Sequence, residues 1–266
     1  MKTSYEGALF YTSLSSSIEK NLIKQRLKKA IGPLLGKPYE TDPYLSFAEK
    51  CLAPVASPVI VDVGANIGTT VLPLAKKYPH ARFFAVEPHP VPAGRFIQNC
   101  ELNHVSNVSL VNAAIAPASQ FVKIYTCPSN SGGHRITGFE GRTDIGSLPK
   151  IDHISILSIS LHSLFSHFDI AYCDLLKIDV EGFECQVLES LENLLTPQKV
   201  GTIVVEYGPE GMKKAGKTGW DMVKMMLGKG FQCMELKTQR PIATELDIPH
   251  LPDFTVTDFV FYSQKL

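Results

Sequence analysis

Apolar and polar positions follow two rhythms along most of this chain. From residue 58 onward, short apolar runs of strand length alternate with longer segments whose apolar residues recur every three or four positions. The runs that predict strands are 58–63, 82–86, 108–113, 174–179, 201–206, 231–236 and 256–263. The segments that predict helices are 66–78, 91–103, 183–195 and 218–229. This alternation predicts an α/β fold with a mostly parallel sheet covered on both faces.

Two regions depart from the alternation. No helical pattern separates strands 231–236 and 256–263, so we expect these two strands to be antiparallel neighbours. Residues 121–125 and 154–159 alternate with period two and predict additional strands. The stretch 127–150 between them is rich in Gly, Ser and Asn, which is typical of a functional or disordered loop.

Residues 1–54 have a pattern of their own. Apolar residues at helical spacing between Leu14 and Ile31, with lysines on the other faces, predict a basic amphipathic helix that ends at the Gly-Pro pair 32–33. Such a helix can pack its apolar stripe on the main domain, which we favour, or make peripheral contact with a membrane surface. We therefore divide the chain into an N-terminal helical extension, 1–54, and a main domain, 55–266.

Composition adds few constraints. The 266 residues carry 26 Lys and Arg against 26 Asp and Glu, and this balance argues against a nucleic-acid partner. No apolar run approaches the ~20 residues that a membrane span requires, and no signal peptide is visible at the start of the sequence. The six cysteines have neither zinc-finger nor C-x-x-C spacing. We expect a cytoplasmic protein with reduced thiols and no dedicated metal site.

The strand 58–63 runs into a turn with Gly64, Asn66 and Gly68. A dinucleotide-binding turn has a glycine at its middle position so that the backbone can approach a pyrophosphate. Asn66 at that position favours an adenosine ligand without a pyrophosphate, and S-adenosylmethionine is the common ligand of that kind. Asp62 is suited to hold an amino group, and the N–H groups that begin the next helix are suited to a carboxylate. A plain connection between strand and helix would also contain such glycines.

Carboxylates lie at the ends of two further strands. Glu87 ends strand 82–86 and lies 23 positions after Gly64, close to the ~20 expected of a carboxylate that binds ribose hydroxyls. Asp179, Glu181 and Glu184 follow strand 174–179. Carboxylates there could bind an acceptor, hold a metal or act as a base, although helix-dipole chemistry alone could explain Glu184.

These segments together resemble the FkbM-type family of S-adenosylmethionine-dependent methyltransferases. The resemblance is carried by residues 61–68, 86–88, 176–184 and 203–206, and it covers about 55–263. It implies a Rossmann-like class I methyltransferase fold, with a mostly parallel seven-stranded sheet whose last strand is antiparallel. It also implies methyl transfer, most often to a hydroxyl of a sugar, glycan or other small natural product.

The resemblance also implies roles for individual residues. The methionine end of the cofactor would be bound by Asp62, Gly64, Asn66 and Gly68, the ribose by Glu87, and the adenine by Asn112 and Ala113. The transfer site would be faced by Asp179, Glu181 and Glu206.

A histidine offers a further candidate for the general base. His134 lies in the loop 127–150, and an unperturbed imidazole titrates near neutral pH. A surface histidine would look the same in the sequence. The loop itself, with Arg135 and Arg142, is our candidate for recognition of a small-molecule or glycan acceptor.

Two other functions stay open at this point. A nicotinamide-dependent Rossmann oxidoreductase shares the strand-turn-helix pattern, although Asn66 and the carboxylates after strand 174–179 argue against it. A module that binds the cofactor without turnover would show the same motifs. The identity of the acceptor, the need for a divalent metal and the oligomeric state do not follow from the sequence.

Overall fold

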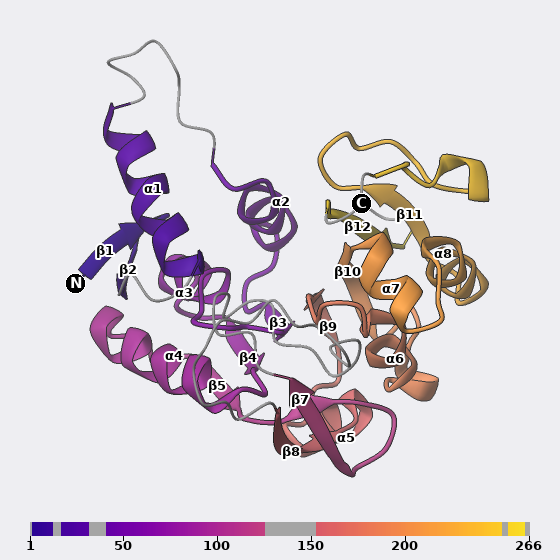
Figure 1. Cartoon of the computed structure of the whole chain (residues 1–266), viewed down its shortest axis with the longest axis horizontal. Helices are drawn as coiled ribbons and strands as arrows, with labels where there is room; N and C mark the ends of the chain where they lie inside the picture. Colours follow the sequence, from indigo (N-terminus) through magenta and orange to yellow (C-terminus); the bar gives the residue numbers. More distant parts are fainter. Residues whose placement is uncertain (1, 13–16, 32–40, 126–152, 252–254, 264–266) are drawn as a thin grey trace.

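The computed structural model describes residues 2–12, 17–31, 41–125, 153–251 and 255–263 (Figure 1). Its centre is a seven-stranded sheet with the strand order β11-β12-β10-β9-β3-β4-β5. The strands are β3 (Val59–Val63), β4 (Arg82–Val86), β5 (Val108–Val111), β9 (Cys173–Ile178), β10 (Val200–Tyr207), β11 (Gln232–Glu235) and β12 (Thr257–Tyr262). The strand β12 is antiparallel to both β10 and β11, and the other central pairs are parallel. The sheet predicted from the sequence is therefore confirmed.

Helices cover both faces of this sheet (Figure 1). One face packs against α2 (Pro43–Leu52), α3 (Val71–Lys77) and α4 (Pro90–Asn103). The other face packs against α5 (Leu161–His167), α6 (Glu184–Glu189), α7 (Pro209–Lys214) and α8 (Gly219–Gly228). Because the central strands are buried on both sides, their sequences are almost continuously apolar.

Acidic and basic residues gather at one edge of the sheet, on one of its faces. Side chains alternate between the two faces of a strand, and the face toward α2 and α3 carries Ile60, Leu175 and Val204. Further along, toward the carboxyl ends of the parallel strands, that same face carries acidic and basic side chains. These are Asp62, Lys177, Asp179, Glu206 and Asp258. The sheet thus has an apolar middle and a charged carboxyl edge below α2.

A second, smaller sheet lies beside the first. Its strands β6 (Ala114–Ile115), β7 (Phe121–Tyr125) and β8 (His153–Ile159) have the order β6-β8-β7. The pair β7–β8 is antiparallel, which confirms the additional strands predicted at 121–125 and 154–159. The loop predicted at 127–150 lies outside the described residues.

The N-terminal segment is more structured than its sequence pattern predicts. A hairpin of β1 (Lys2–Tyr5) and β2 (Ala8–Tyr11) precedes α1 (Ser17–Ile31). The hairpin strands have only four residues each, too few for a clear period, and α2 was not predicted from the sequence. On α1, Leu22 is buried while Lys20, Lys24 and Arg26 are exposed, as expected for a helix that packs on the main domain. The domain boundary between residues 54 and 55 stays a prediction.

Two expected helices are shorter in the structure, and two short ones were missed. The helix expected at 66–78 begins only at Val71, because Gly64, Asn66 and Gly68 have φ values of 88°, 49° and 90°, which no right-handed helix contains. The helix expected at 183–195 ends as α6 at Glu189, and Glu192 with φ 55° begins a separate 3₁₀ turn (Glu192–Leu194). The short helices α5 and α7 escaped the pattern because each spans about two turns or fewer.

Within the described residues, no helix has the length and apolar character needed to cross a membrane.

Candidate functional site

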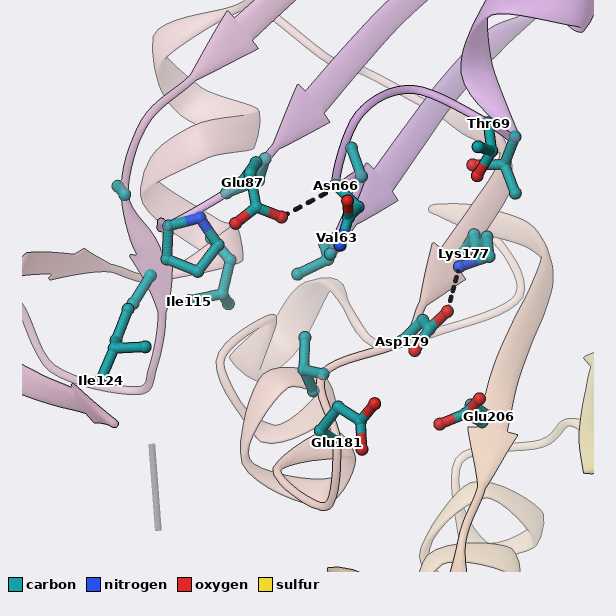
Figure 2. Close-up of a pocket in the computed structure, with 18 of the residues that line it drawn as sticks. Val63, Asn66, Thr69, Glu87, Ile115, Ile124, Lys177, Asp179, Glu181 and Glu206 are labelled. Atoms are coloured by element: carbon teal, nitrogen blue, oxygen red, sulfur yellow. Dashed lines mark hydrogen bonds and ion pairs between the residues drawn. The ribbon is translucent and has the colours of Figure 1, made fainter. Parts of the chain in front are cut away.

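A cavity of about 300 Å³ opens at the carboxyl ends of β3, β4, β9 and β10 (Figure 2). Its volume lies at the lower end of the range for small-molecule sites. Seven of the residues predicted to bind cofactor or face the transfer site line it, namely Gly64, Asn66, Glu87, Ala113, Asp179, Glu181 and Glu206. Asp62, Gly68 and Asn112 adjoin these residues in the chain without lining the cavity. His134 lies outside the described residues.

The turn after β3 requires its glycines for contacts within the protein. A Cβ atom at Gly64 would lie 1.8 Å from the backbone oxygen of Asp179, so only glycine lets β3 pass the end of β9. A Cβ atom at Gly68 would lie 3.0 Å from Leu72 and from Phe96 of α4. Gly64 is thus required by the close approach of the neighbouring strand.

Glu87 is held in place by two backbone N–H groups. The N–H of Asn66 donates to Glu87 Oε2 at 2.9 Å (Figure 2), and the N–H of His89 donates to Oε1 at 2.8 Å. Glu87 is 5% exposed, and burial raises its pKa to about 7 against the opposing effect of these two bonds. Each carboxylate oxygen has a second lone pair, so both can accept further hydrogen bonds from a ligand.

Asp62 lies under the cavity with one unsatisfied oxygen. Thr70 Oγ1 donates to Asp62 Oδ2 at 2.5 Å, whereas Oδ1 is buried and has no hydrogen-bond partner among the described residues. Burial raises the pKa of Asp62, and the nearby ammonium of Lys177 counteracts this rise. A buried acceptor without a donor is costly, so this oxygen is suited to a ligand's ammonium or to a bridging water.

Lys177 is the only Lys or Arg among the described residues that line the cavity. Its Nζ lies 2.9 Å from Asp179 Oδ2 (Figure 2) and 5.8 Å from the ring centre of Tyr44 on α2. In the sheet register it is directly opposite Asp62. Burial alone would lower the pKa of Lys177, but the carboxylates of Asp179 and Asp62 raise it, so the side chain stays cationic. Lys177 lies in the segment 176–184 that carries the family resemblance, and no role was predicted for it.

Three carboxylates form a row across adjacent strands. Asp179 follows β9, Glu206 lies near the end of β10, and Asp258 pairs with Glu206 in the antiparallel register of β12. Burial, reinforced by Asp179 and Glu181, raises the pKa of Glu206 well above its usual value, and burial raises that of Asp258 to about 6. Asp258 was not predicted, because only the register of β12 brings it beside Glu206.

Glu181 completes the acidic side of the cavity. It lies in the turn between β9 and α6 with φ 59°, and Figure 2 shows its carboxylate facing the same space as Asp179 and Glu206. Glu87 lies on the opposite side (Figure 2). The cavity therefore has two carboxylate-bearing walls. In the described part of the chain no group of three or more His, Cys, Asp or Glu side chains could hold a metal ion.

Asn112 supports Glu87 rather than the cavity itself. Its Nδ2 donates to the carbonyl oxygens of Glu87 at 2.8 Å and of Pro88 at 3.0 Å. The next residue, Ala113, lines the cavity together with Ile115 and Ile124, which form an apolar wall (Figure 2). Asn112 thus fixes the backbone from which Glu87 projects.

Comparison with known proteins gives a family match and distant relatives. A family model described as the methyltransferase FkbM domain matches residues 62–233, more than half of the chain. A protein named Methyltransferase 1 from Beauveria bassiana is 28% identical over 161 residues, which cover 55% of this chain and 65% of that protein. Methyltransferase sdnD from Sordaria araneosa is 27% identical over 180 residues, covering 59% of this chain and 70% of that protein.

A third relative comes from an archaeon. Hexuronic acid methyltransferase AglP from Haloferax volcanii is 28% identical over 148 residues, covering 56% of this chain and 55% of that protein. This chain therefore spans just over half of the Haloferax protein and just under two thirds of the Beauveria protein.

Proposed function

Because this chain belongs to the FkbM methyltransferase family, we propose that it transfers a methyl group from S-adenosylmethionine to a hydroxyl of a sugar, glycan or other small natural product. Methyl transfer and the methyl donor follow from the family. The hydroxyl acceptor is the part that we infer. The observation that supports it is the partly buried Glu206, which faces the cavity beside two further carboxylates.

Residues that line the cavity or lie beside it fit the donor. Asp62 Oδ1, buried and without a hydrogen-bond partner among the described residues, would accept from the ammonium of the methionine end. Glu87, fixed by the N–H groups of Asn66 and His89, would accept from the two ribose hydroxyls. The apolar wall that includes Ala113 and Ile115 would contact the adenine.

The acidic side of the cavity supplies the base. When bound, the donor supplies an electrophilic methyl group, and a hydroxyl that attacks it must lose a proton. Asp179 already has a cationic partner, Lys177, at 2.9 Å. Burial and the neighbouring carboxylates raise the pKa of Glu206 well above its usual value, and a carboxylate with a raised pKa is a stronger base, so we assign the role of proton acceptor to Glu206. Asp179 and Glu181 would orient the acceptor by accepting its other hydroxyl groups.

The acceptor class rests on chemistry and on one relative. The Haloferax relative is named for methylation of a hexuronic acid, which supports a sugar acceptor for this chain. A hydroxyl acceptor requires a base, whereas a sugar carboxylate is already ionised and requires none. The balanced charge of the chain supports a small-molecule or glycan acceptor over a nucleic acid, and the proposal retains the cytoplasmic location expected from the sequence.

A transfer assay tests this proposal. Purified protein is incubated with methyl-labelled S-adenosylmethionine and a panel of neutral glycosides, uronic acids and hydroxylated metabolites. For an acceptor that takes the label, Glu206→Gln should lower kcat by about 10²–10⁴ while the Kd for S-adenosylmethionine stays within about twofold. Glu189→Gln, at an exposed carboxylate that pairs with Lys217, is the matched control and should leave kcat unchanged.

Three outcomes would contradict the proposal. An unchanged kcat in Glu206→Gln would remove Glu206 as the base. Saturable binding of S-adenosylmethionine without transfer to any member of a broad panel would favour a cofactor-binding module. Binding of NAD in place of S-adenosylmethionine would favour the oxidoreductase alternative, for which the comparisons give no support.

A further inference from the structure

A residue of the N-terminal segment lines the cofactor cavity. Ile18 of α1 lines the same cavity as the turn residues Asn66 and Thr69, although it lies more than forty positions before the family-matched region 62–233. The segment that carries Ile18 therefore either completes the cofactor site or only packs beside it. The contacts that hold the segment decide between these alternatives.

The hairpin β1–β2 is fixed to α4 by two asparagine side chains. Asn103 accepts from the N–H of Leu9 at 2.7 Å and donates to the Leu9 carbonyl at 2.6 Å. Asn99 accepts from the N–H of Tyr11 at 2.8 Å. Phe10 is fully buried between these bonds. The paired backbone bonds give the hairpin one defined position on the main domain.

Asn99 also reaches the cofactor turn. Its Nδ2 donates to the carbonyl of Ile67 at 3.0 Å, while its Oδ1 accepts from Tyr11. One fully buried side chain thus joins the hairpin to the turn that lines the cavity. Ile67 packs in the same apolar cluster as Phe10 and Leu22 of α1. The hairpin, α1 and the turn after β3 therefore form one packed unit.

The first half of α1 is partly buried against the main domain, whereas the second half is exposed and pairs with the hairpin turn through Lys29, whose Nζ lies 3.8 Å from Glu6 Oε2. Leu22 is 4% exposed, and Glu19 is buried with its carboxylate 3.9 Å from Arg95 of α4. Residues 26–30 are all exposed, including Leu27 at 53%. The docked half is the half that carries Ile18, so the side chain that reaches the cavity lies on the well-anchored part of the helix.

From these contacts we propose that the N-terminal segment completes the cofactor site, with Ile18 as the side chain that covers bound S-adenosylmethionine beside the turn after β3. This inference rests on the cofactor named above. It means that part of the affinity for the cofactor comes from residues outside the family-matched domain.

Calorimetric titration of the full chain with S-adenosylmethionine and with S-adenosylhomocysteine tests the proposal. Ile18→Ser removes the apolar contact and should raise both Kd values about fivefold. Leu27→Ser, which also replaces an aliphatic side chain by serine but on the exposed half of α1, is the matched control and should leave both Kd values unchanged. Thermal unfolding of both variants verifies that they fold. A Kd for Ile18→Ser within about twofold of the wild-type value would overturn the proposal.

Hydrogen exchange on the unmodified protein gives an independent readout. Saturating S-adenosylmethionine should slow amide exchange at residues 18–22 and leave residues 26–30 unchanged. Equal exchange at residues 18–22 with and without the cofactor would overturn the proposal even if Ile18→Ser failed to fold. Failure of the wild-type protein to bind S-adenosylmethionine at all would instead contradict the function proposed above, and the two failures are therefore distinguishable.

Discussion

Acidification from pH 8 to pH 6 should weaken the binding of S-adenosylmethionine through a single side chain, Glu87. This carboxyl group is 5% exposed, and burial raises its pKa to about 7. It must be ionised to accept hydrogen bonds from both ribose hydroxyls, because protonation turns one of its oxygens into an O–H donor and reduces the number of bonds that it can accept. Binding of the cofactor is therefore coupled to loss of the proton from Glu87.

The size of the effect follows from that pKa. A group with a pKa of about 7 is about nine-tenths ionised at pH 8 and about one-tenth ionised at pH 6. The apparent Kd rises as the competent fraction falls, so we expect about a tenfold weaker affinity at pH 6 than at pH 8. The change should be steepest near pH 7 and should level off above pH 8.

Calorimetric titration at pH 6, 7 and 8, at constant ionic strength, measures this dependence. Glu87→Gln is the decisive variant, since it keeps the shape of the side chain and removes the titration. Its Kd at pH 8 should be at least about tenfold higher than that of the wild type, because charge-assisted hydrogen bonds are lost. Asp62 and Glu206 remain in both proteins, so their titration contributes equally to both. A pH dependence of the same size in Glu87→Gln and in the wild type would refute the reasoning.

Three further predictions concern the stability of the protein without ligand. Gly64→Ala places a Cβ atom 1.8 Å from the Asp179 carbonyl and should lower the free energy of unfolding by about 3 kcal/mol or more. Gly7→Ala has a similar φ, 84°, but no atom within 4 Å, and should cost only about 1–2 kcal/mol; equal losses in urea denaturation would contradict this account. Asp179→Asn removes the anionic partner of the buried Lys177 and should lower the free energy of unfolding by about 1–3 kcal/mol, a range that is discounted for the partial exposure of Asp179. An unchanged urea midpoint would contradict this prediction. Folding raises the pKa of Glu87, so its stabilising contribution is present at low pH and is lost as the pH rises from about 4.5 to about 7, where the free energy of unfolding should fall by about 3 kcal/mol. The stability of the wild type should fall over this range more than that of Glu87→Gln, and an equal fall would contradict the assignment.

The central sheet could be predicted because its burial leaves a direct trace in the sequence. Strands covered on both faces are continuous apolar runs, and the missing helical pattern before residue 256 already indicated the antiparallel end of the sheet. Short elements leave no comparable trace. The hairpin β1–β2 has four residues in each strand, and α7 has six residues, so neither completes enough periods to be recognised.

Site residues could be predicted from the sequence where their position depends only on residues close to them in the chain. Glu87, Asp179 and Glu181 follow strands directly, and the parallel arrangement brings strand ends to one edge. Features that depend on register or on distant segments were missed. Asp258 reaches Glu206 only through the antiparallel pairing of β12, and Ile18 reaches the cavity only because Asn99 and Asn103 fix the preceding hairpin.

Glycine shows how a correct motif can have an incomplete physical explanation. The turn was identified from Gly64 and Gly68, and Gly64 lines the cavity as expected. The atoms that require these glycines, however, belong to the protein: the Asp179 carbonyl and the side chains of Leu72 and Phe96. Spacing in a sequence cannot distinguish a ligand from a neighbouring strand as the reason for a missing Cβ atom.

The chemical position of a transferred methyl group tests the proposed function most directly. The protein is incubated with S-adenosylmethionine that carries a deuterated methyl group, together with neutral glycosides and uronic acids, and the products are examined by mass spectrometry before and after mild alkali. Transfer to a hydroxyl assisted by Glu206 predicts a deuterated methyl ether that withstands alkali and whose formation is strongly reduced in Glu206→Gln. A product that alkali hydrolyses, formed equally well by both proteins, would be a methyl ester and would contradict a hydroxyl acceptor.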